Sequence, residues 1–254
     1  MSQDLEVEPG VTVGDWLMRE FTAHYYLETE PWATERAARV VARLDPHRRS
    51  GQGGRALEVV IPWITAPLAF TAPGRFIFFG RRLYERCPDD ETTAFVVGHE
   101  MAHHDLGHLD LIPDWMPRFA HAKGGRLAVV AMAAVEHRLY GPERECLADQ
   151  YALDLCIRAG YDPHRCLAFF QIMENYALDM GDYGMVFGPD EESDAELEPD
   201  APWLTKARIW AWQRTYGYLP LRDRRARLEH YLRDRGVSER AAVDCISQAA
   251  QPSE

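Results

Sequence analysis

The chain has 254 residues, of which 46% are hydrophobic and 27% charged, and its formal net charge is −12. This length and composition exclude a disordered or fibrous protein and allow one globular domain with a full core. The negative charge argues against nucleic acid or an anionic membrane surface as the main partner.

Two features bear on where the chain works. Its longest apolar run covers residues 127–135, too short for a membrane-spanning helix of about 20 residues, and the acidic residues 1–10 lack the apolar core of a signal peptide. The five cysteines are odd in number and include no CxxC pair, which favours free thiols over disulfides. We therefore expect a cytoplasmic protein without a membrane span.

Hydrophobic periodicity predicts a helix-rich chain with a small sheet. Two amphipathic helices are expected over residues 14–28 and 31–44. Three short strands follow over residues 57–61, 68–71 and 75–79, around turns rich in glycine and proline. The remaining elements are predicted as helices, over residues 89–112, 126–140, 142–159, 162–178, 203–216, 221–235 and 238–250.

Two charged segments interrupt this pattern. Residues 180–202 carry seven acids between positions 190 and 200, and we expect an exposed, mobile acidic loop that is either a simple insertion or a lid over the active site. A later basic run is interpreted as a solvated helix face, because acids interrupt it. That run consists of Arg222, Arg224, Arg225 and Arg227.

The segment from His99 to His103 reads His-Glu-Met-Ala-His, an HExxH motif inside the helix predicted for residues 89–112. On a helix, His99 and His103 lie on one face a single turn apart, where two neutral imidazoles can bind one Zn²⁺. Glu100 lies about 100° round the helix, a position suited to a general base beside the metal, as in metalloproteases.

The alternative is a chance motif in a helix that binds no metal. Apolar residues at helical spacing around the motif predict that this helix is largely buried. Buried histidine and glutamate side chains are costly unless they are paired or bound to a metal. The sequence therefore favours one zinc ion at this motif.

A zinc site of this kind needs a third protein ligand, which leaves the fourth position for water. His104 and His108 lie about 140° and 180° from His99 on a straight helix, so neither reaches the same ion unless the helix bends. The longer HExxHxxGxxH pattern is not met, because Leu106 and Leu109 occupy its glycine and histidine positions. The third ligand should therefore come from another helix.

Glu145 and Asp149 are candidate partners on the helix that follows the break at residues 141–142. They are four residues apart and share a face. Glu145 could complete a His, His, Glu zinc set, and Asp149 could accept a hydrogen bond from the far nitrogen of a ligand histidine. The same spacing also fits an exposed acidic face paired with Arg144 or Arg158, and taken alone it favours that second interpretation.

The HExxH helix is followed about forty residues later by Glu-Cys-Leu-Ala-Asp at residues 145–149. This combination resembles the HtpX and CAAX-prenyl-protease family of zinc metallopeptidases. Residues 74–80 and 159–163 are also similar to segments of that family, and the resemblance covers roughly residues 57–217.

The resemblance implies specific roles for the motif residues. His99, His103 and Glu145 would be the ligands of a single zinc ion. Glu100 would be the catalytic base and acid, and Asp149 would hold a ligand histidine through a hydrogen bond. Protein or peptide substrates are implied in the same way.

One segment departs from the family pattern. Family members carry a His-Pro segment before an Arg-bearing helix, and this His steadies the oxyanion of the transition state. We match the segment to residues 200–208, where Ala201 stands in place of the His and Arg208 is the candidate for the Arg. Loss of an oxyanion donor typically costs about 10²–10³ in turnover, so activity could be low or could depend on another donor.

The predicted sheet offers a candidate site for substrate pairing. An extended peptide can bind an edge strand by main-chain hydrogen bonds. The candidate edge strand consists of Phe76, Ile77, Phe78 and Phe79. The alternative is that these side chains are simply core.

We therefore expect one α+β domain, a helix-rich zincin-like metallopeptidase of the glutamate-ligand type with a small β-sheet beside the active-site helix. Residues 1–56 would form helices packed on the core, residues 57–217 the peptidase core, and residues 218–254 the C-terminal helices. The expected function is zinc-dependent endopeptidase activity. The alternative is a zinc-bound but weakly active or inactive binding or regulatory module, with a protein partner that the sequence does not identify.

Overall fold

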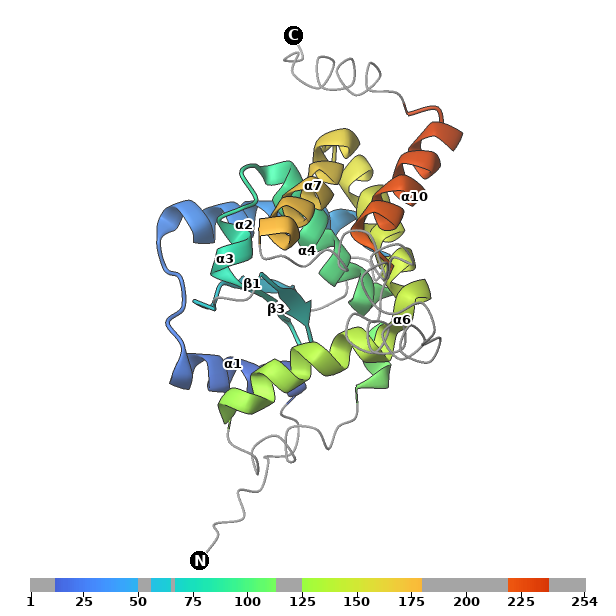
Figure 1. Cartoon of the computed structure of the whole chain (residues 1–254). Coiled ribbons are helices and arrows are strands. Elements are labelled where there is room, and N and C mark those ends of the chain that lie inside the picture. The colour runs from blue at the N-terminus through green and yellow to red at the C-terminus, as the bar shows by residue number, and fades with distance from the viewer. Residues whose placement is uncertain (1–11, 50–55, 65–66, 113–124, 180–218, 238–254) are drawn as a thin grey trace, which may run out of the picture.

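The structure is a computed structural model that describes residues 12–49, 56–64, 67–112, 125–179 and 219–237. These residues form a helix-rich α+β domain around a three-stranded sheet (Figure 1). The helices are α1 (Val13–His24), α2 (Pro31–Leu44), α3 (Arg81–Tyr84), α4 (Asp90–Asp105), α6 (Gly125–Arg158), α7 (Pro163–Asp179) and α10 (Leu221–Asp234). The strands are β1 (Glu58–Val60), β2 (Ala69–Thr71) and β3 (Phe76–Phe79), and two 3₁₀ helices are η1 (Asp45–His47) and η3 (His108–Leu111).

The helices and strands predicted within these ranges are present, with ends shifted by at most seven residues. Several other predictions lie outside the described residues. They concern the acidic segment 180–202, Ala201, Arg208, and the helices expected over residues 203–216 and 238–250.

The strand order in the sheet is β1-β3-β2, with β1 parallel and β2 antiparallel to β3. β3 is therefore the central strand, and all four of its residues are buried. The prediction that Phe76, Ile77, Phe78 and Phe79 form an edge strand for substrate is wrong, because neighbouring strands occupy both hydrogen-bonding edges of β3. The alternative interpretation of these side chains as core is correct.

Alternate side chains of β3 belong to two separate hydrophobic clusters, as expected for a strand covered on both faces. Phe76 and Phe78 pack in one cluster with Leu17 and other α1 residues. Ile77 and Phe79 pack in the other cluster, which contains residues of α2, α4, α6 and α7. The sheet is thus fixed between α1 on one side and the HExxH-bearing helix α4 on the other (Figure 1).

Helix α4 begins at a side-chain cap and ends at a glycine. The Asp89 carboxylate accepts a hydrogen bond of 2.9 Å from the backbone N–H of Thr92, which satisfies a donor of the first turn. Gly107 adopts a left-handed conformation with φ 71°, which most side chains disfavour and which ends a helix readily. The helix therefore ends before the expected residue 112.

Helix α6 contains a break at Gly141, where φ is 67° and ψ is 169°. Pro142 follows at once and starts the second half of the helix, as the sequence predicted. This second half ends near Gly160, which has φ 76°. The break separates residues 125–140 from the segment that carries Glu145 and Asp149.

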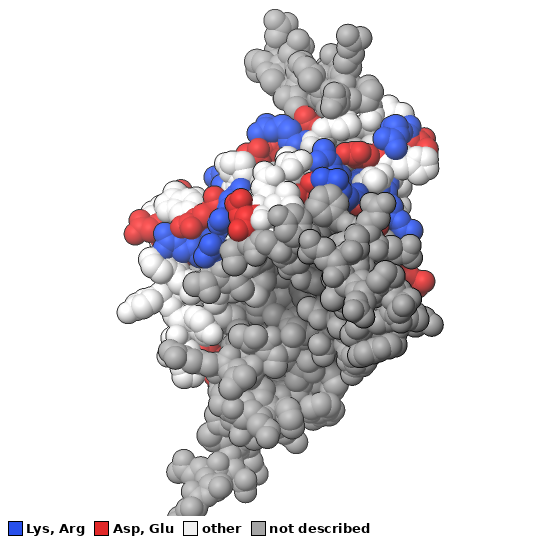
Figure 2. Space-filling model, viewed as in Figure 1, with Lys and Arg blue, Asp and Glu red and all other residues white. Residues whose placement is uncertain are grey.

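The visible face of the described region carries acidic and basic side chains intermixed (Figure 2). Ion pairs join such side chains at the surface of the described region: Arg165 lies 2.9 Å from Asp89 and 3.1 Å from Glu91, and its side chain is exposed. Within the described ranges, no helix combines the length and apolar character needed to cross a membrane.

Candidate metal centre

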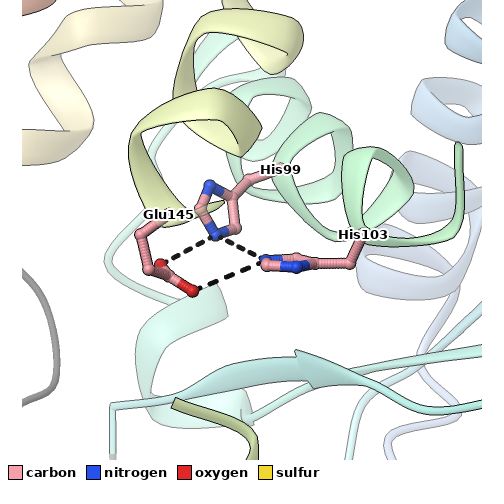
Figure 3. A group of neighbouring side chains, drawn as sticks. All are labelled: His99, His103 and Glu145. Atoms are coloured by element: carbon pink, nitrogen blue, oxygen red, sulfur yellow. Dashed lines mark hydrogen bonds and ion pairs between the residues drawn. The ribbon is translucent and has the colours of Figure 1, made fainter. Parts of the chain in front are cut away.

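The three predicted ligands converge between α4 and α6, with their side chains turned toward one another (Figure 3). Nε2 of His99 lies 3.2 Å from Nε2 of His103 and 3.3 Å from Oε2 of Glu145, and Nε2 of His103 lies 3.7 Å from Oε1 of Glu145. A tetrahedral zinc ion bound at about 2.0–2.1 Å places its ligand atoms about 3.3 Å apart. The donor types and spacing therefore fit a zinc site that keeps its fourth position open.

Close packing of two helices brings Glu145 to the histidines. A Cβ atom on Gly98 would lie 3.4 Å from Cα and 3.5 Å from Cβ of Ala152, so the backbones of α4 and α6 nearly touch beside the motif. Small residues at both positions permit this approach. Helical spacing then places Glu145, about two turns before Ala152, opposite His99.

Asp149 and Arg224 hold the far side of His99. Nδ1 of His99 lies 2.9 Å from Oδ1 of Asp149, which leaves Nε2 directed to the metal position. The guanidinium of Arg224 donates two hydrogen bonds to Asp149, of 2.6 and 2.7 Å, and its Nη2 lies 3.6 Å from Oε2 of Glu145. The exposed acidic face considered for Glu145 and Asp149 is therefore wrong, because both are at least 98% buried.

Arg224 is the site residue that the sequence interpretation missed. It was assigned to a solvated basic face, whereas it is only 8% exposed and its neighbours Arg222 and Arg227 are exposed. Its position in the sequence carried a usable signal, because Leu221, Arg224 and Leu228 follow helical spacing and form one buried face of α10. An arginine within an apolar stripe indicates a buried ion pair.

The buried charges set the protonation of the ligands. Burial lowers the pKa of His99, but its hydrogen bonds to Asp149 and Glu145, together with their charges, outweigh burial and raise that pKa to about 10. Burial raises the pKa of Glu145, but His99, His103 and Arg224 hold it well below its usual range. The pKa of Asp149 is lowered too, because Arg224 and His99 outweigh burial. Both carboxylates are therefore ionised at neutral pH and attract a cation.

Glu100 lies beside the ligands and is 5% exposed. Burial raises its pKa to about 7; the positive charges of His99 and Arg224 oppose this rise and the charge of Glu145 adds to it. A bound divalent cation favours the charged carboxylate. A carboxylate whose pKa lies near neutrality can both accept and return a proton.

The neighbouring histidines do not join the ligand group. Nε2 of His104 lies 2.6 Å from the Thr71 hydroxyl on β2, away from the ligands. Nδ1 of His108 lies 3.0 Å from Nδ1 of His103, on the side opposite the nitrogen that faces Glu145. The prediction that neither histidine supplies the third ligand is consistent with this arrangement.

A pocket opens beside the ligands and Glu100. His99, Glu100, Glu145 and Arg224 form its polar end, and apolar side chains form most of the rest. The apolar lining consists of Pro67, Leu68, Ala69, Leu83, Phe95, Val96, Phe169, Met173 and Leu221. Ala69 belongs to β2, so an edge strand of the sheet borders the same pocket as His99 and Glu145, two of the candidate metal ligands.

The fold and the donor set together define a helix-rich α+β domain of the zincin type. The sequence model of peptidase family M48 matches residues 31–205, more than half of the chain. The chain belongs to peptidase family M48, which confirms the resemblance to HtpX and CAAX-prenyl-protease-type zinc metallopeptidases. A comparison with curated proteins found no match.

Proposed function

We propose that this chain is a zinc-dependent endopeptidase that hydrolyses peptide bonds in protein or peptide substrates. The observation that carries the proposal is the convergence of His99, His103 and Glu145 at zinc-ligand spacing, with Glu100 beside them. Membership of a family of zinc metallopeptidases supports the same activity.

The side chains of the site have separate roles in the proposed hydrolysis. His99, His103 and Glu145 would hold one zinc ion, which when bound lowers the pKa of a water molecule and polarises the scissile carbonyl. Glu100 accepts the proton of the attacking water and passes it to the leaving amine. Asp149 keeps the His99 ring oriented with Nε2 toward the metal position.

The pocket supports peptide binding beside β2. Because β3 is the central strand, the strand edge available next to the ligands is that of β2, whose Ala69 lines the pocket. A substrate main chain could pair with this edge while one apolar side chain enters the pocket.

The four described cysteines form no disulfide, which supports our proposal of a reducing, cytoplasmic location.

Metal removal tests the proposal directly. We expect a chelator to abolish cleavage of casein and stoichiometric zinc to restore it. Glu145→Gln should weaken zinc binding by more than the about 10–100-fold that loss of a ligand's hydrogen-bond partner costs. The matched control is Glu143→Gln. Glu143 is an exposed acid two residues before Glu145 on the same helix, and this variant should bind zinc and cleave like the wild type.

Two results would contradict the proposal. Chelator-insensitive cleavage would exclude a metal mechanism. A protein with one bound zinc ion that cleaves no unfolded substrate would instead support the non-catalytic binding module.

A further inference from the structure

His103 and His108 make a buried contact through their Nδ1 atoms. The two nitrogens lie 3.0 Å apart, and the residues are 2% and 5% exposed. The Nε2 atom of His103 faces the other way, 3.7 Å from Oε1 of Glu145 and 3.2 Å from Nε2 of His99. The contact therefore lies behind a metal ligand rather than within the ligand group.

The chemistry of imidazole fixes which nitrogen donates. A neutral histidine that binds a metal through Nε2 carries its proton on Nδ1. The Nδ1–H of His103 then points at Nδ1 of His108, so the latter nitrogen must carry a lone pair and His108 must hold its proton on Nε2. A nitrogen–nitrogen contact of 3.0 Å is an ordinary hydrogen bond in this arrangement.

The backbone places His108 there by ending the helix. On a continuous helix, a residue five positions after His103 would lie about 140° away from it and could not reach its ring. Gly107, with φ 71°, interrupts the helical path after α4, and η3 then begins at His108. The left-handed conformation of Gly107 thus allows Nδ1 of His108 to contact Nδ1 of His103.

We propose that His108 is a positioning residue that accepts a hydrogen bond from Nδ1–H of His103 and so directs the Nε2 lone pair of His103 to the metal. This rests on the metal site of the proposed function, though not on its peptidase activity. The two ligand histidines are thereby held in different ways. His99 donates to the carboxylate of Asp149, whereas His103 donates to a neutral ring.

Zinc affinity, measured by competition with a chromogenic chelator, tests this assignment. His108→Leu removes the acceptor at similar volume, and we expect zinc binding about 10–100-fold weaker. His108→Asn keeps an acceptor oxygen near the place of Nδ1 and should restore most of that affinity. His104→Leu removes the neighbouring half-buried histidine, whose Nε2 contacts the Thr71 hydroxyl, and should leave zinc affinity unchanged.

Two results would overturn the assignment: zinc affinity of His108→Leu equal to that of the wild type, or His108→Asn as weak as His108→Leu. If His108→Leu does not fold, ¹⁵N–¹H correlation spectra of the zinc-loaded wild type decide the question. They should show the proton of His103 on Nδ1 and that of His108 on Nε2, and a protonated Nδ1 on His108 would overturn the role. Wild-type protein that binds no zinc would instead remove the proposed function itself.

Discussion

Arg224 of α10 donates two hydrogen bonds, of 2.6 and 2.7 Å, to the carboxylate of Asp149 on α6. Asp149 in turn lies 2.9 Å from Nδ1 of His99. Helix α10 therefore fixes Asp149, the residue that contacts the proposed zinc ligand His99. The arginine also helps to balance the buried negative charges of Asp149 and Glu145, together with His99 and His103.

Removal of Arg224 should cost much stability. Arg224→Met leaves two buried carboxylates less compensated, and breaking a buried ion pair typically costs about 3–5 kcal/mol. Arg225→Met on the same helix removes a half-exposed pair with Glu229 at 2.8 Å and an exposed hydrogen bond of 3.2 Å to Gln171, and should change the free energy of unfolding by less than about 1 kcal/mol. Urea unfolding of the metal-free proteins measures both, and equal losses for the two variants would contradict this role.

Zinc binding should release a proton from His99. In the metal-free protein the pKa of His99 is raised to about 10, because Asp149 and Glu145 outweigh burial, so the ring is protonated at about pH 8.5. Zinc needs the Nε2 lone pair and displaces that proton. Zinc affinity should therefore rise about tenfold per pH unit up to the pKa.

Calorimetry in buffers of different ionisation enthalpy counts the protons released. At pH 8.5 we expect about one proton from His99 and up to one more from a zinc-bound water, whose pKa lies near 7. Asp149→Asn removes a charge that raises the pKa of His99, so the number should fall at the same pH. Release of the same number of protons by the wild type and Asp149→Asn would contradict this protonation of His99.

The buried carboxyl group of Glu100 should destabilise the metal-free protein above neutral pH. Burial raises the folded-state pKa of Glu100 to about 7 from an ordinary value of 4.5, so the folded chain holds this proton more tightly than the unfolded chain. The contribution of Glu100 to the free energy of unfolding is therefore fully present below about pH 4.5 and is lost as the pH rises through about 7.

Glu100→Gln replaces this acid by a neutral side chain of similar shape. The variant should gain stability over the wild type as the pH rises from about 4.5 to about 7, and the gain should then level off. The exposed Glu143→Gln should show no such gain. Thermal unfolding in the presence of chelator, at pH values across this window, measures the effect. A gain in stability that does not depend on pH would contradict the raised pKa of Glu100.

The pocket predicts a preference for apolar side chains next to the cleaved bond. Its walls beyond the ligands are apolar, and half-buried Phe169 forms part of them. Phe169→Ala should widen the pocket and shift cleavage toward larger apolar residues. The difference in activation free energy between two substrates whose side chains differ by one methylene should change by about 1–3 kcal/mol. Cleavage-site sequencing of a digested proteome compares the two profiles, and an unchanged profile would show that the pocket does not select the substrate.

How much of the site the sequence could predict depended on sequence separation. His99, Glu100 and His103 lie within one helical turn or so, and their relative geometry follows from the helix alone. Glu145 has no such local signal, because its meeting with His99 depends on the packing of Gly98 against Ala152. Only the resemblance to a peptidase family favoured it over an exposed acid.

Two errors have the same physical origin. Arg224 pairs with a residue 75 positions away, and a charge pattern read along one helix does not show that partner. Strand β3 was expected at a sheet edge, but a run of buried apolar residues is equally suited to a centre, and strand order is fixed by long-range pairing. The contact of His108 with His103 likewise depends on the left-handed conformation of Gly107, which periodicity does not reveal.

The most direct measurement compares cleavage of an unfolded protein by the wild type and by Glu100→Gln, both loaded with one zinc ion. We expect the wild type to cleave and the variant to lose at least about 10²-fold in turnover while it binds zinc as tightly, because Glu100 moves the proton but is not a ligand. Equal cleavage by both proteins would contradict the role of Glu100. Absence of cleavage by the zinc-loaded wild type would contradict the peptidase function itself.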